Sequence, residues 1–537
     1  MRLFDCHASF GLPTRPGPGS CRTADDLLRR MDRHGIERAL VLHAAVDTES
    51  PPVGTAIALE ACRADPRLEA ALPLATPQTG EFPQAEELLD WLRGHGVRAL
   101  WARPQQHRYH LDTVTFGETF EVLAAAGVPL LYEIDDHTKW TTVGEILGDF
   151  PGLTLIAVGH GCWGDDRIFR PLLDRHENLH LDMSRYEVDQ GISRVVERYG
   201  ANRLVFGTGF PRWSMGGPVA ALLRAPIDDG ARQAIGGENL ERLLSWDASG
   251  SSSGSSSGGP LAAAEAISSL TGTVLEAPRP EHPIIDTHGH FGPFTKIWLP
   301  TQDATDMVGT MDRCGVRVTI CSHHTGISGD AVLANRWLRE RALERQPDRL
   351  LGYYVWNPHQ AEEQEAALTD FPAHPGFVGF KLHPSSHGVP LCDDRYRPVL
   401  ERAEAGGWPV LSHTWGGSAE DGPEQVRRVL ESYPSIPFLM GHSCFGDWDT
   451  AIGLAKDHPN AYLELTAAYA VEPVIERLAS GAGSERVLMG TDLPWFDPMF
   501  CIGCILFADI DDEDRLNILY RNALKLFPRV RAVTDGG

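Results

Sequence analysis

The sequence predicts an α/β protein built from two (β/α)₈ TIM barrels related by internal duplication. Short Val/Leu/Ile runs alternate with amphipathic segments rich in Ala, Arg and Glu along the whole chain. The same series of motifs occurs twice, and a Ser/Gly tract separates the two copies. With 537 residues the chain is too long for one compact core, whereas two barrels of ~250 residues each account for its length.

The first half, residues 1–247, contains eight candidate strands, each followed by a helical pattern. These runs are Arg2 to Asp5, Arg38 to Leu42, Ala70 to Leu74, Ala99 to Ala102, Pro129 to Ile134, Thr154 to Val158, Leu179 to Met183 and Leu204 to Gly207. The second half, residues 260–537, repeats this order. Between them, residues 248–259 form a Ser/Gly linker whose regular repetition is typical of an engineered tether, so we expect two polypeptides fused into one chain.

The duplication can be followed position by position. Residues 31–36 read M-D-R-H-G-I and residues 311–316 read M-D-R-C-G-V, which sets an offset of 280. The offset is 282 where G-H-G-C at 159–162 meets G-H-S-C at 441–444, and 283 where F-G-T-G at 206–209 meets M-G-T-D at 489–492. Such a slow drift predicts two homologous domains.

Bulk properties exclude several classes of function. The formal net charge of −25 disfavours a general affinity for nucleic acid or anionic membrane. Met1 leads at once into a strand-like run, and no apolar run reaches the ~18 residues that span a bilayer. The ten cysteines show no paired spacing, which favours a cytoplasmic protein with reduced thiols. Cys501 and Cys504 form an isolated C-x-x-C, interpreted as two small residues of a buried segment.

Polar residues close five of the apolar runs in the second half. A (β/α)₈ barrel places its active site at the carboxyl ends of its strands, so these residues are the candidates. They are His288 and His290 in I-D-T-H-G-H, Lys381 and His383 in F-K-L-H-P, His413 in S-H-T, His442 in G-H-S and Asp492 in G-T-D-L-P. A single histidine is more often structural, but burying so many polar groups together has a desolvation cost that indicates a functional site. Because residues two apart on a strand share a face, His288 and His290 can bind one metal ion.

This ordered set resembles the amidohydrolase superfamily, in particular its amidohydrolase-related branch of metal-dependent hydrolases and decarboxylases, over nearly all of residues 283–528. The resemblance implies that His288, His290 and Asp492 are metal ligands and that His413 is a further ligand. It implies that His442 polarises the substrate or completes a second metal site. Lys381 is either a carboxylated lysine that bridges two metals or an ammonium that binds a substrate carboxylate.

These ligands predict the chemistry. Nitrogen and carboxylate donors suit one or two Zn²⁺ ions, with Mn²⁺ or Fe²⁺ as alternatives, and the metal lowers the pKa of a bound water toward ~7. The expected reaction is hydrolysis of an amide, lactam or related C–N bond in a small molecule or peptide. Asp492 moves the proton from water to the leaving nitrogen, with His442 and Lys381 as the other catalytic residues. A metal-dependent, non-oxidative decarboxylase of the same branch and a non-catalytic heterodimeric scaffold are the alternatives.

Further candidates also follow strands of the second half. His323, His324, Trp356 and Glu464 are expected to shape the pocket, although His323 has a counterpart in His43, which favours a structural role. Trp356, Trp415 and Trp495 suit an apolar or aromatic substrate.

The first half has lost most of the set. His7 and His160 match His288 and His442, whereas Ser9, Trp101, Glu133 and Gly209 replace His290, Lys381, His413 and Asp492. This half is therefore expected to be a degenerate pseudoenzyme without metal, with a degraded site of His7, Glu133 and His160 as the alternative. We expect it to pair with the second barrel as a pseudo-two-fold heterodimer. Arg185, Arg212 and Trp213 are candidates for reaching the active site of the partner barrel.

Overall fold

A computed structural model describes residues 1–17, 19–247, 269–276, 282–301, 303–371 and 374–535. The chain divides into two compact units, Met1–Gly272 and Thr273–Gly537. The predicted Ser/Gly linker, residues 248–259, lies outside the described residues. The expectation of two (β/α)₈ barrels is confirmed, because each unit contains an eight-stranded parallel sheet in sequential order.

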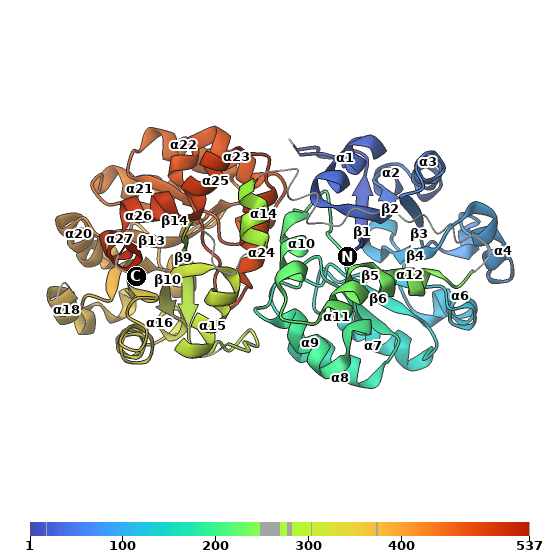
Figure 1. The fold of residues 1–537 in the computed structure, drawn as a ribbon, viewed down its shortest axis with the longest axis horizontal. Coiled ribbons are helices and arrows are strands. Elements are labelled where there is room, and N and C mark those ends of the chain that lie inside the picture. Colours follow the sequence, from blue (N-terminus) through green and yellow to red (C-terminus); the bar gives the residue numbers. More distant parts are fainter. Residues whose placement is uncertain (18, 248–268, 277–281, 302, 372–373, 536–537) are drawn as a thin grey trace. The chain divides into compact units, whose positions relative to one another are not determined.

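Strands and helices alternate in both units, and the helices lie outside the strands (Figure 1). The first sheet contains β1 (Leu3–Phe10), β2 (Ile36–His43), β3 (Leu68–Pro73), β4 (Ala99–Ala102), β5 (Leu130–Glu133), β6 (Leu155–Val158), β7 (Leu179–Asp182) and β8 (Leu204–Val205). The second contains β9 (Ile284–Phe291), β10 (Val316–His323), β11 (Leu350–Val355), β12 (Phe377–Leu382), β13 (Val410–Trp415), β14 (Phe438–Phe445), β15 (Ala461–Glu464) and β16 (Val487–Leu488).

The helices of the first unit are α1 (Ala24–His34), α2 (Ala45–Thr48), α3 (Pro51–Ala64), α4 (Ala85–His95), α5 (Pro104–His107), α6 (Thr113–Ala126), α7 (Lys139–Asp149), α8 (Asp166–Arg175), α9 (Gly191–Tyr199), α10 (Gly216–Arg224), α11 (Asp229–Gln233) and α12 (Asn239–Leu244). After α14 (Ser269–Glu276), the chain continues with α15 (Ala304–Cys314), α16 (His324–Ser328), α17 (Ala331–Leu338), α18 (Ala361–Asp370), α19 (Pro384–His387), α20 (Arg397–Gly406) and α21 (Pro423–Ser432). It ends with α22 (Trp448–Asp457), α23 (Val474–Ala482), α24 (Pro498–Phe507), α25 (Asp512–Leu516), α26 (Asn522–Leu526) and α27 (Pro528–Asp535).

Backbone hydrogen bonds between the first strand and the segment after the eighth strand join the two edges of each sheet. In the first unit, the Cys6 amide donates to the Phe206 carbonyl at 2.9 Å. In the second, the Thr287 amide donates to the Met489 carbonyl at 3.0 Å, and the Asp492 amide donates to the His288 carbonyl at 2.8 Å. This closure brings the first-strand histidine next to the residues that follow strand eight.

A buried aspartate reinforces this closure in both units. Asp286 accepts hydrogen bonds from the Thr491 amide at 3.1 Å and from its hydroxyl at 2.7 Å. Asp5 accepts the same pair of hydrogen bonds from Thr208. Burial raises the pKa of Asp286 to about 8. The aspartate of the I-D-T-H-G-H motif is therefore a structural residue that joins the first and last strands.

The interior of each barrel is filled by apolar side chains, each of which contributes roughly 1.5–3 kcal/mol when fully buried. In the first unit the core cluster consists of Phe4, Cys6, Leu40, Leu42, Ala71, Ala99, Trp101, Leu131, Ile156, Val158, Val205, Leu240, Leu243 and Leu244. In the second it includes Ile285, Val318, Ile320, Leu351, Tyr353, Val378, Leu411, Leu439, Tyr462, Leu488, Ala523, Phe527, Val530 and Val533. Both barrels are thus packed cores with their polar residues at the strand ends.

The repeated M-D-R-x-G motif ends the first long helix of each unit. Gly35 has a φ of 65° and Gly315 a φ of 76°, and each amide caps the preceding helical turn. Since only glycine adopts this left-handed conformation without a steric penalty, the motif marks the point where α1 and α15 stop and β2 and β10 begin.

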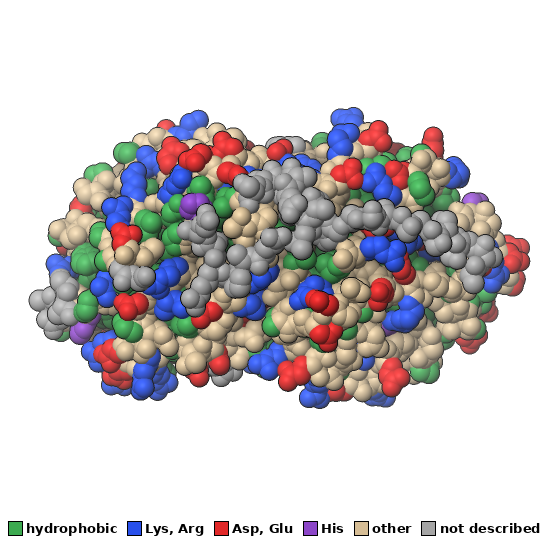
Figure 2. Space-filling view, in the orientation of Figure 1, with side chains coloured by type: hydrophobic (Ala, Val, Ile, Leu, Met, Phe, Trp, Pro, Cys, Tyr) green, Lys and Arg blue, Asp and Glu red, His purple; other side chains and the backbone are tan. Residues whose placement is uncertain are grey.

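The surface carries charged side chains of both signs. Acidic and basic side chains are interspersed over the visible face of each unit (Figure 2). Within the part of the chain that the structure describes, no helix combines the length and apolar character needed to cross a membrane. Cys501 and Cys504 lie buried on α24, as the sequence predicts.

Candidate active site

The structure places at strand ends all six residues of the second unit for which the sequence predicts a catalytic or metal-binding role. His288 and His290 lie on β9, Lys381 on β12, His413 on β13 and His442 on β14, while Asp492 follows β16. His413 is partly exposed, and the other five are buried. The His442 ring lies 5.2 Å from the His288 ring and 4.7 Å from the His413 ring, measured between centroids.

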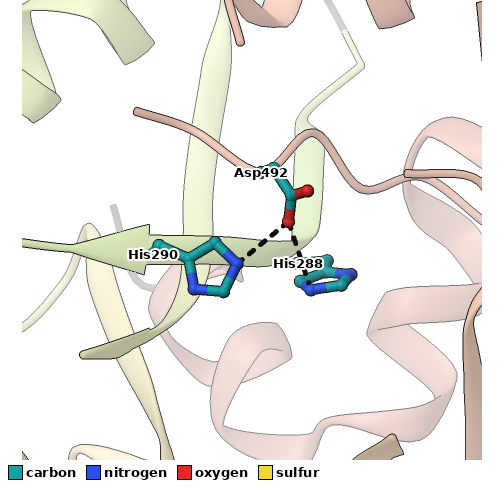
Figure 3. Close-up of side chains that lie close together, drawn as sticks. All are labelled: His288, His290 and Asp492. Carbon is teal, nitrogen blue, oxygen red and sulfur yellow. Dashed lines mark hydrogen bonds and ion pairs between the residues drawn. The ribbon is translucent and has the colours of Figure 1, made fainter. Parts of the chain in front are cut away.

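His288, His290 and Asp492 form the tightest group (Figure 3). One carboxylate oxygen, Oδ1 of Asp492, lies 3.0 Å from Nε2 of His290 and 3.3 Å from Nε2 of His288. Three ligand atoms within 4.8 Å of one another are close enough to bind one metal ion.

Each of the two β9 histidines is fixed by a partner on its other nitrogen. Nδ1 of His288 lies 2.7 Å from Oε2 of Glu464, and Nδ1 of His290 lies 3.1 Å from Oγ of Ser322. A neutral imidazole that donates Nδ1–H to Glu464 presents a lone pair at Nε2. That lone pair faces the Asp492 oxygen at 3.3 Å, an arrangement that a cation between them would make favourable. The donor atoms therefore fit a divalent metal ion.

His442 has a hydrogen bond that defines its tautomer. Its Nδ1 lies 3.0 Å from the carbonyl oxygen of Thr466, and a carbonyl oxygen only accepts, so Nδ1 carries the proton. Burial holds the pKa of His442 well below its usual value, which keeps the ring neutral. Nε2 of His442 consequently offers a lone pair that can bind a metal or accept a proton, and it does not donate to a substrate oxygen.

Lys381 lies inside the group, with Nζ 2.6 Å from Nε2 of His288. Burial lowers the pKa of Lys381, while Asp492 and Glu464 oppose that shift. Because one lone pair serves one partner at a time, a metal ion on Nε2 of His288 would displace Lys381 from this contact.

His413 belongs to a different group of donors. Its Nδ1 lies 2.8 Å from Oδ2 of Asp421, and these two residues form a second candidate metal cluster with His383. The geometry thus gathers three of the four predicted ligands in one place and puts the fourth beside them.

The backbone at Asp492 is strained. Its φ is 60°, in the left-handed region, where a residue other than glycine pays about 1–2 kcal/mol. His442 has a φ of 66°. Strained backbone conformations of this kind cluster at functional sites, where the direction that a side chain must take outweighs the backbone preference of the residue.

The secondary candidates fall into two groups. Trp495 stacks on His290 and His324 with ring centroids 5.0 and 5.4 Å apart, and Trp415 lies 5.8 Å from His413, so these two tryptophans border the site. Trp356 is fully buried, and its indole N–H donates to the carbonyl oxygen of Arg395, consistent with a packing role.

The two histidines that follow β10 differ in their contacts. The His323 side chain caps α16 and packs against Gly292, as His43 packs against Gly11 in the first unit. His324 stacks 4.9 Å from His290 and bonds the Gly292 carbonyl oxygen through Nδ1 at 2.6 Å. The structural role expected for His323 agrees with this geometry, and His324 is the one that contacts the site.

The first unit fills the corresponding space with its own side chains. Trp101 is buried and meets His7 edge to face at 5.0 Å. Gly209 keeps a positive φ of 69°, but a Cβ there would lie 2.6 Å from Cδ1 of Trp213. Trp213 is itself covered by the guanidinium groups of Arg185 and Arg212, 3.9 and 4.6 Å from its ring. The proposed contribution of these three residues to the other barrel stays a prediction.

Few of the residues that contact the candidate ligands are marked in the sequence. The sequence predicts only that Glu464 shapes the pocket, and no motif marks Ser322, Thr466 or Asp421. One signal was present, because Glu464 corresponds to Asp182 at the offset of 282 that holds for the neighbouring strand. An acidic residue at the same strand end in both halves indicates that the histidine kept on the first strand has the same kind of partner in each.

Comparisons with solved structures place similar folds over 46% of this chain. A 5-carboxyvanillate decarboxylase from Novosphingobium aromaticivorans DSM 12444, complexed with manganese, is 15% identical to this chain. The match covers 96% of that protein, with a TM-score of 0.38. A 2,6-dihydroxybenzoate decarboxylase from Rhizobium shows 15% identity over 99% of its length, with a TM-score of 0.38. An uncharacterized TIM-barrel protein from Bordetella bronchiseptica shows 19% identity, 99% coverage and a TM-score of 0.39. No curated protein matches the chain.

A family model named Amidohydrolase matches the sequence twice, over residues 4–246 and 285–529. The two matches cover most of the chain, one in each barrel, and the second contains every candidate ligand. The chain therefore belongs to the amidohydrolase family, of which it contains two homologous barrels.

Proposed function

We propose that the second barrel is a metal-dependent hydrolase that cleaves an amide, lactam or related C–N bond, and that the first barrel is its non-catalytic partner. The observation that supports this proposal is the convergence of His288, His290 and Asp492 on one point, with Lys381 and His442 next to it. Zn²⁺ is the preferred ion for two imidazoles and a carboxylate, with Mn²⁺ and Fe²⁺ as alternatives. When bound, a divalent ion supplies a Lewis acid and lowers the pKa of water.

Three side chains have separate roles in the proposed reaction. Asp492 accepts the proton of the attacking water and returns it to the leaving nitrogen, which is the task of a carboxylate held at the reacting centre. The ammonium of Lys381 stabilises negative charge that develops on the substrate oxygen. His442, with a lone pair at Nε2, binds the ion or accepts a proton. Of the two roles that the resemblance implies for His442, polarising the substrate or completing a second metal site, a lone pair at Nε2 supports the second.

The position of Lys381 supports decarboxylation as the second candidate function. A buried ammonium that contacts His288 is suited to pair with a substrate carboxylate, and the same metal ligands would hold that substrate. Trp495 and Trp415 would border a planar aromatic acid.

Product analysis with the metal-loaded full chain separates these reactions. The substrate panel contains chromogenic amides, lactams and aromatic carboxylates, and turnover is run in H₂¹⁸O. We expect ¹⁸O in the carboxylate product and loss of turnover in Asp492→Asn. Release of CO₂ without ¹⁸O incorporation would instead identify the decarboxylase. A folded, metal-loaded chain without any turnover would support the scaffold alternative.

The role of the first barrel is tested separately. Residues 260–537 expressed alone are expected to lose activity or stability without residues 1–247. Full activity from a stable isolated second barrel would make the first barrel dispensable. Pairing of the barrels as a pseudo-two-fold heterodimer stays a prediction, which a co-purification of the two separately expressed halves can check.

A further inference from the structure

We propose that His324 determines substrate specificity, because its Nε2 accepts a hydrogen bond from a hydroxyl or N–H group of a substrate bound at the candidate active site. This inference rests on the proposed function, to which it adds one property of the substrate, a planar group that carries a hydrogen-bond donor. His324 directly follows β10 and is the first residue of α16. From the sequence it is expected only to help shape the pocket.

The loop that follows β9 sets the tautomer of His324. Nδ1 of His324 lies 2.6 Å from the carbonyl oxygen of Gly292, and a carbonyl oxygen only accepts, so Nδ1 carries the proton. A positive charge on a ring that is buried among other rings would be costly, so the ring is neutral. Nε2, at the end of the ring that points away from the α16 backbone, therefore has a lone pair.

This lone pair is buried and unsatisfied. His324 is 1% exposed, and its Nε2 has no hydrogen-bond partner among the residues that the structure describes. A buried acceptor without a partner costs about 1–3 kcal/mol. Unsatisfied polar groups of this kind are rare in native proteins, and beside a candidate active site they indicate a partner that the site binds. A donor group on the substrate would remove this cost.

The surroundings of His324 favour a planar substrate group. Its ring centroid lies 4.9 Å from that of His290, 5.4 Å from that of Trp495 and 5.2 Å from that of Phe294. The planes of His324 and Trp495 are 8° apart, and those of His324 and His290 are 24° apart. His290 is buried, whereas Phe294 and Trp495 are partly exposed. His324 thus lies between a candidate metal ligand and aromatic side chains that reach solvent, and such faces suit a flat, unsaturated group.

The lone pair of His324 is not a fourth ligand of the candidate metal site. The ligand atoms that lie within 4.8 Å of one another at this site come from His288, His290 and Asp492, and among the described residues this group does not include His324. Nε2 of His324 therefore serves a different partner. A substrate held next to the ion is the molecule that comes within its reach.

The first barrel shows that the fold does not require a histidine at this position. At the offset of 280, His323 corresponds to His43, and the two pack in the same way against a glycine after the first strand. The next residue differs, because His324 corresponds to Ala44. The histidine shared by both halves is therefore structural, and the one present only in the half with the candidate metal ligands is suited to serve the substrate.

Binding of two small aromatic probes to the Zn²⁺-loaded full chain, measured by ¹⁹F NMR, tests the proposal. The first probe, 4-fluorophenol, has an O–H donor, and the second, 4-fluoroanisole, has a methyl ether in its place. We expect the wild type to bind 4-fluorophenol about 10-fold more tightly than 4-fluoroanisole. His324→Met should abolish this preference. His324→Gln has a similar length and also loses the present contact with Gly292, but its amide oxygen accepts a hydrogen bond, so it should retain most of the preference.

Three results would overturn the proposal. Equal affinities of the wild type for the two probes show that no acceptor reads the donor. A preference that survives His324→Met belongs to another acceptor, such as Asp492 or the metal ion. A preference that is lost to the same extent in His324→Gln shows that the ring acts through packing alone. If His324→Met does not fold, His324→Ala, which introduces the residue of the first barrel, takes its place.

The binding assay separates this inference from the proposed function, because it needs no turnover. A chain that prefers 4-fluorophenol through His324 but hydrolyses nothing in the substrate panel contradicts the proposed function and leaves the acceptor role of His324 intact. A chain that hydrolyses an amide or lactam but shows no preference between the probes contradicts only the role of His324.

Discussion

In both barrels, a histidine on the first strand is paired with a carboxylate at the end of the seventh strand. Nδ1 of His288 lies 2.7 Å from Glu464, and Nδ1 of His7 lies 2.9 Å from Asp182. The neighbouring hydroxyl is also kept, since Thr466 donates to Glu464 and Ser184 donates to Asp182. The support for the histidine is thus present in both units, and it does not by itself indicate a metal site.

The barrels differ at the positions that this support serves. After strand eight, Asp492 adopts an unfavourable left-handed backbone conformation, with a φ of 60°. Its carboxylate oxygen lies close to both β9 histidines. Gly209 adopts the same conformation with a φ of 69° and leaves room for the ring of Trp213. The comparison teaches that both barrels keep the same backbone at these strand ends, while only the second has side chains there that could bind a metal ion.

The largest effect is expected at Asp492. Asp492→Asn removes the charge and the proton acceptor but keeps the shape of the side chain, and general acid–base catalysis contributes about 10²–10⁴-fold. We expect turnover to fall by on the order of 10³-fold with an unchanged far-UV circular dichroism spectrum. Activity within a few fold of wild type would remove Asp492 from catalysis.

The next largest effect is expected at Glu464, and it should be absent at Asp182, the carboxylate that contacts the first-strand histidine of the first barrel. Glu464→Gln weakens the hold on His288 and is expected to lower metal affinity or turnover by about 10–100-fold. Asp182→Asn makes the matched change in the first barrel and should leave both quantities unchanged. Metal titrations and initial rates measure both. An equal loss in the two variants would show that His7 also serves the catalytic site.

A stability effect is expected at Gly209. Gly209→Ala places a Cβ 2.6 Å from Cδ1 of Trp213, and we expect the free energy of unfolding of the first barrel to fall by roughly 1–3 kcal/mol. Gly80→Ala is the control, because Gly80 has a similar φ of 74° and no atom within 4 Å of the added Cβ. Thermal or denaturant unfolding should show a larger loss for Gly209→Ala. Equal losses would mean that Trp213 does not fill this space.

The smallest expected effect concerns acid stability. Burial lowers the pKa of His34 to about 3, while the unfolded value stays near 6.5, so the neutral ring stabilises the fold above pH 6.5 and this contribution is lost as the pH falls toward 3. The second barrel has Cys314 at this position. In His34→Cys, the loss of stability between pH 6.5 and 5.5 should be smaller by roughly 1 kcal/mol, measured by urea unfolding. An unchanged slope would contradict this account of His34.

Much of the fold follows from the sequence because the motif series is repeated and each motif ends at a residue with a backbone requirement, such as Gly35 and Gly315. The position of His288, His290 and Asp492 at strand ends also predicts that they lie close together, because the strand ends of a barrel meet at one face. Glu464 could have been found from its counterpart Asp182 in the first half. Ser322 and Asp421 could not, because they meet Nδ1 of His290 and of His413 only after the barrel closes or a loop folds back. The tautomer of His442 likewise depends on a carbonyl oxygen, that of Thr466, which no sequence motif marks.

Locating bound metal by anomalous diffraction from crystals of the Zn²⁺-loaded full chain tests the difference between the barrels most directly. The account predicts a peak between His288, His290 and Asp492 and none at His7, Glu133 and His160. A peak in the first barrel at occupancy similar to that in the second would contradict it.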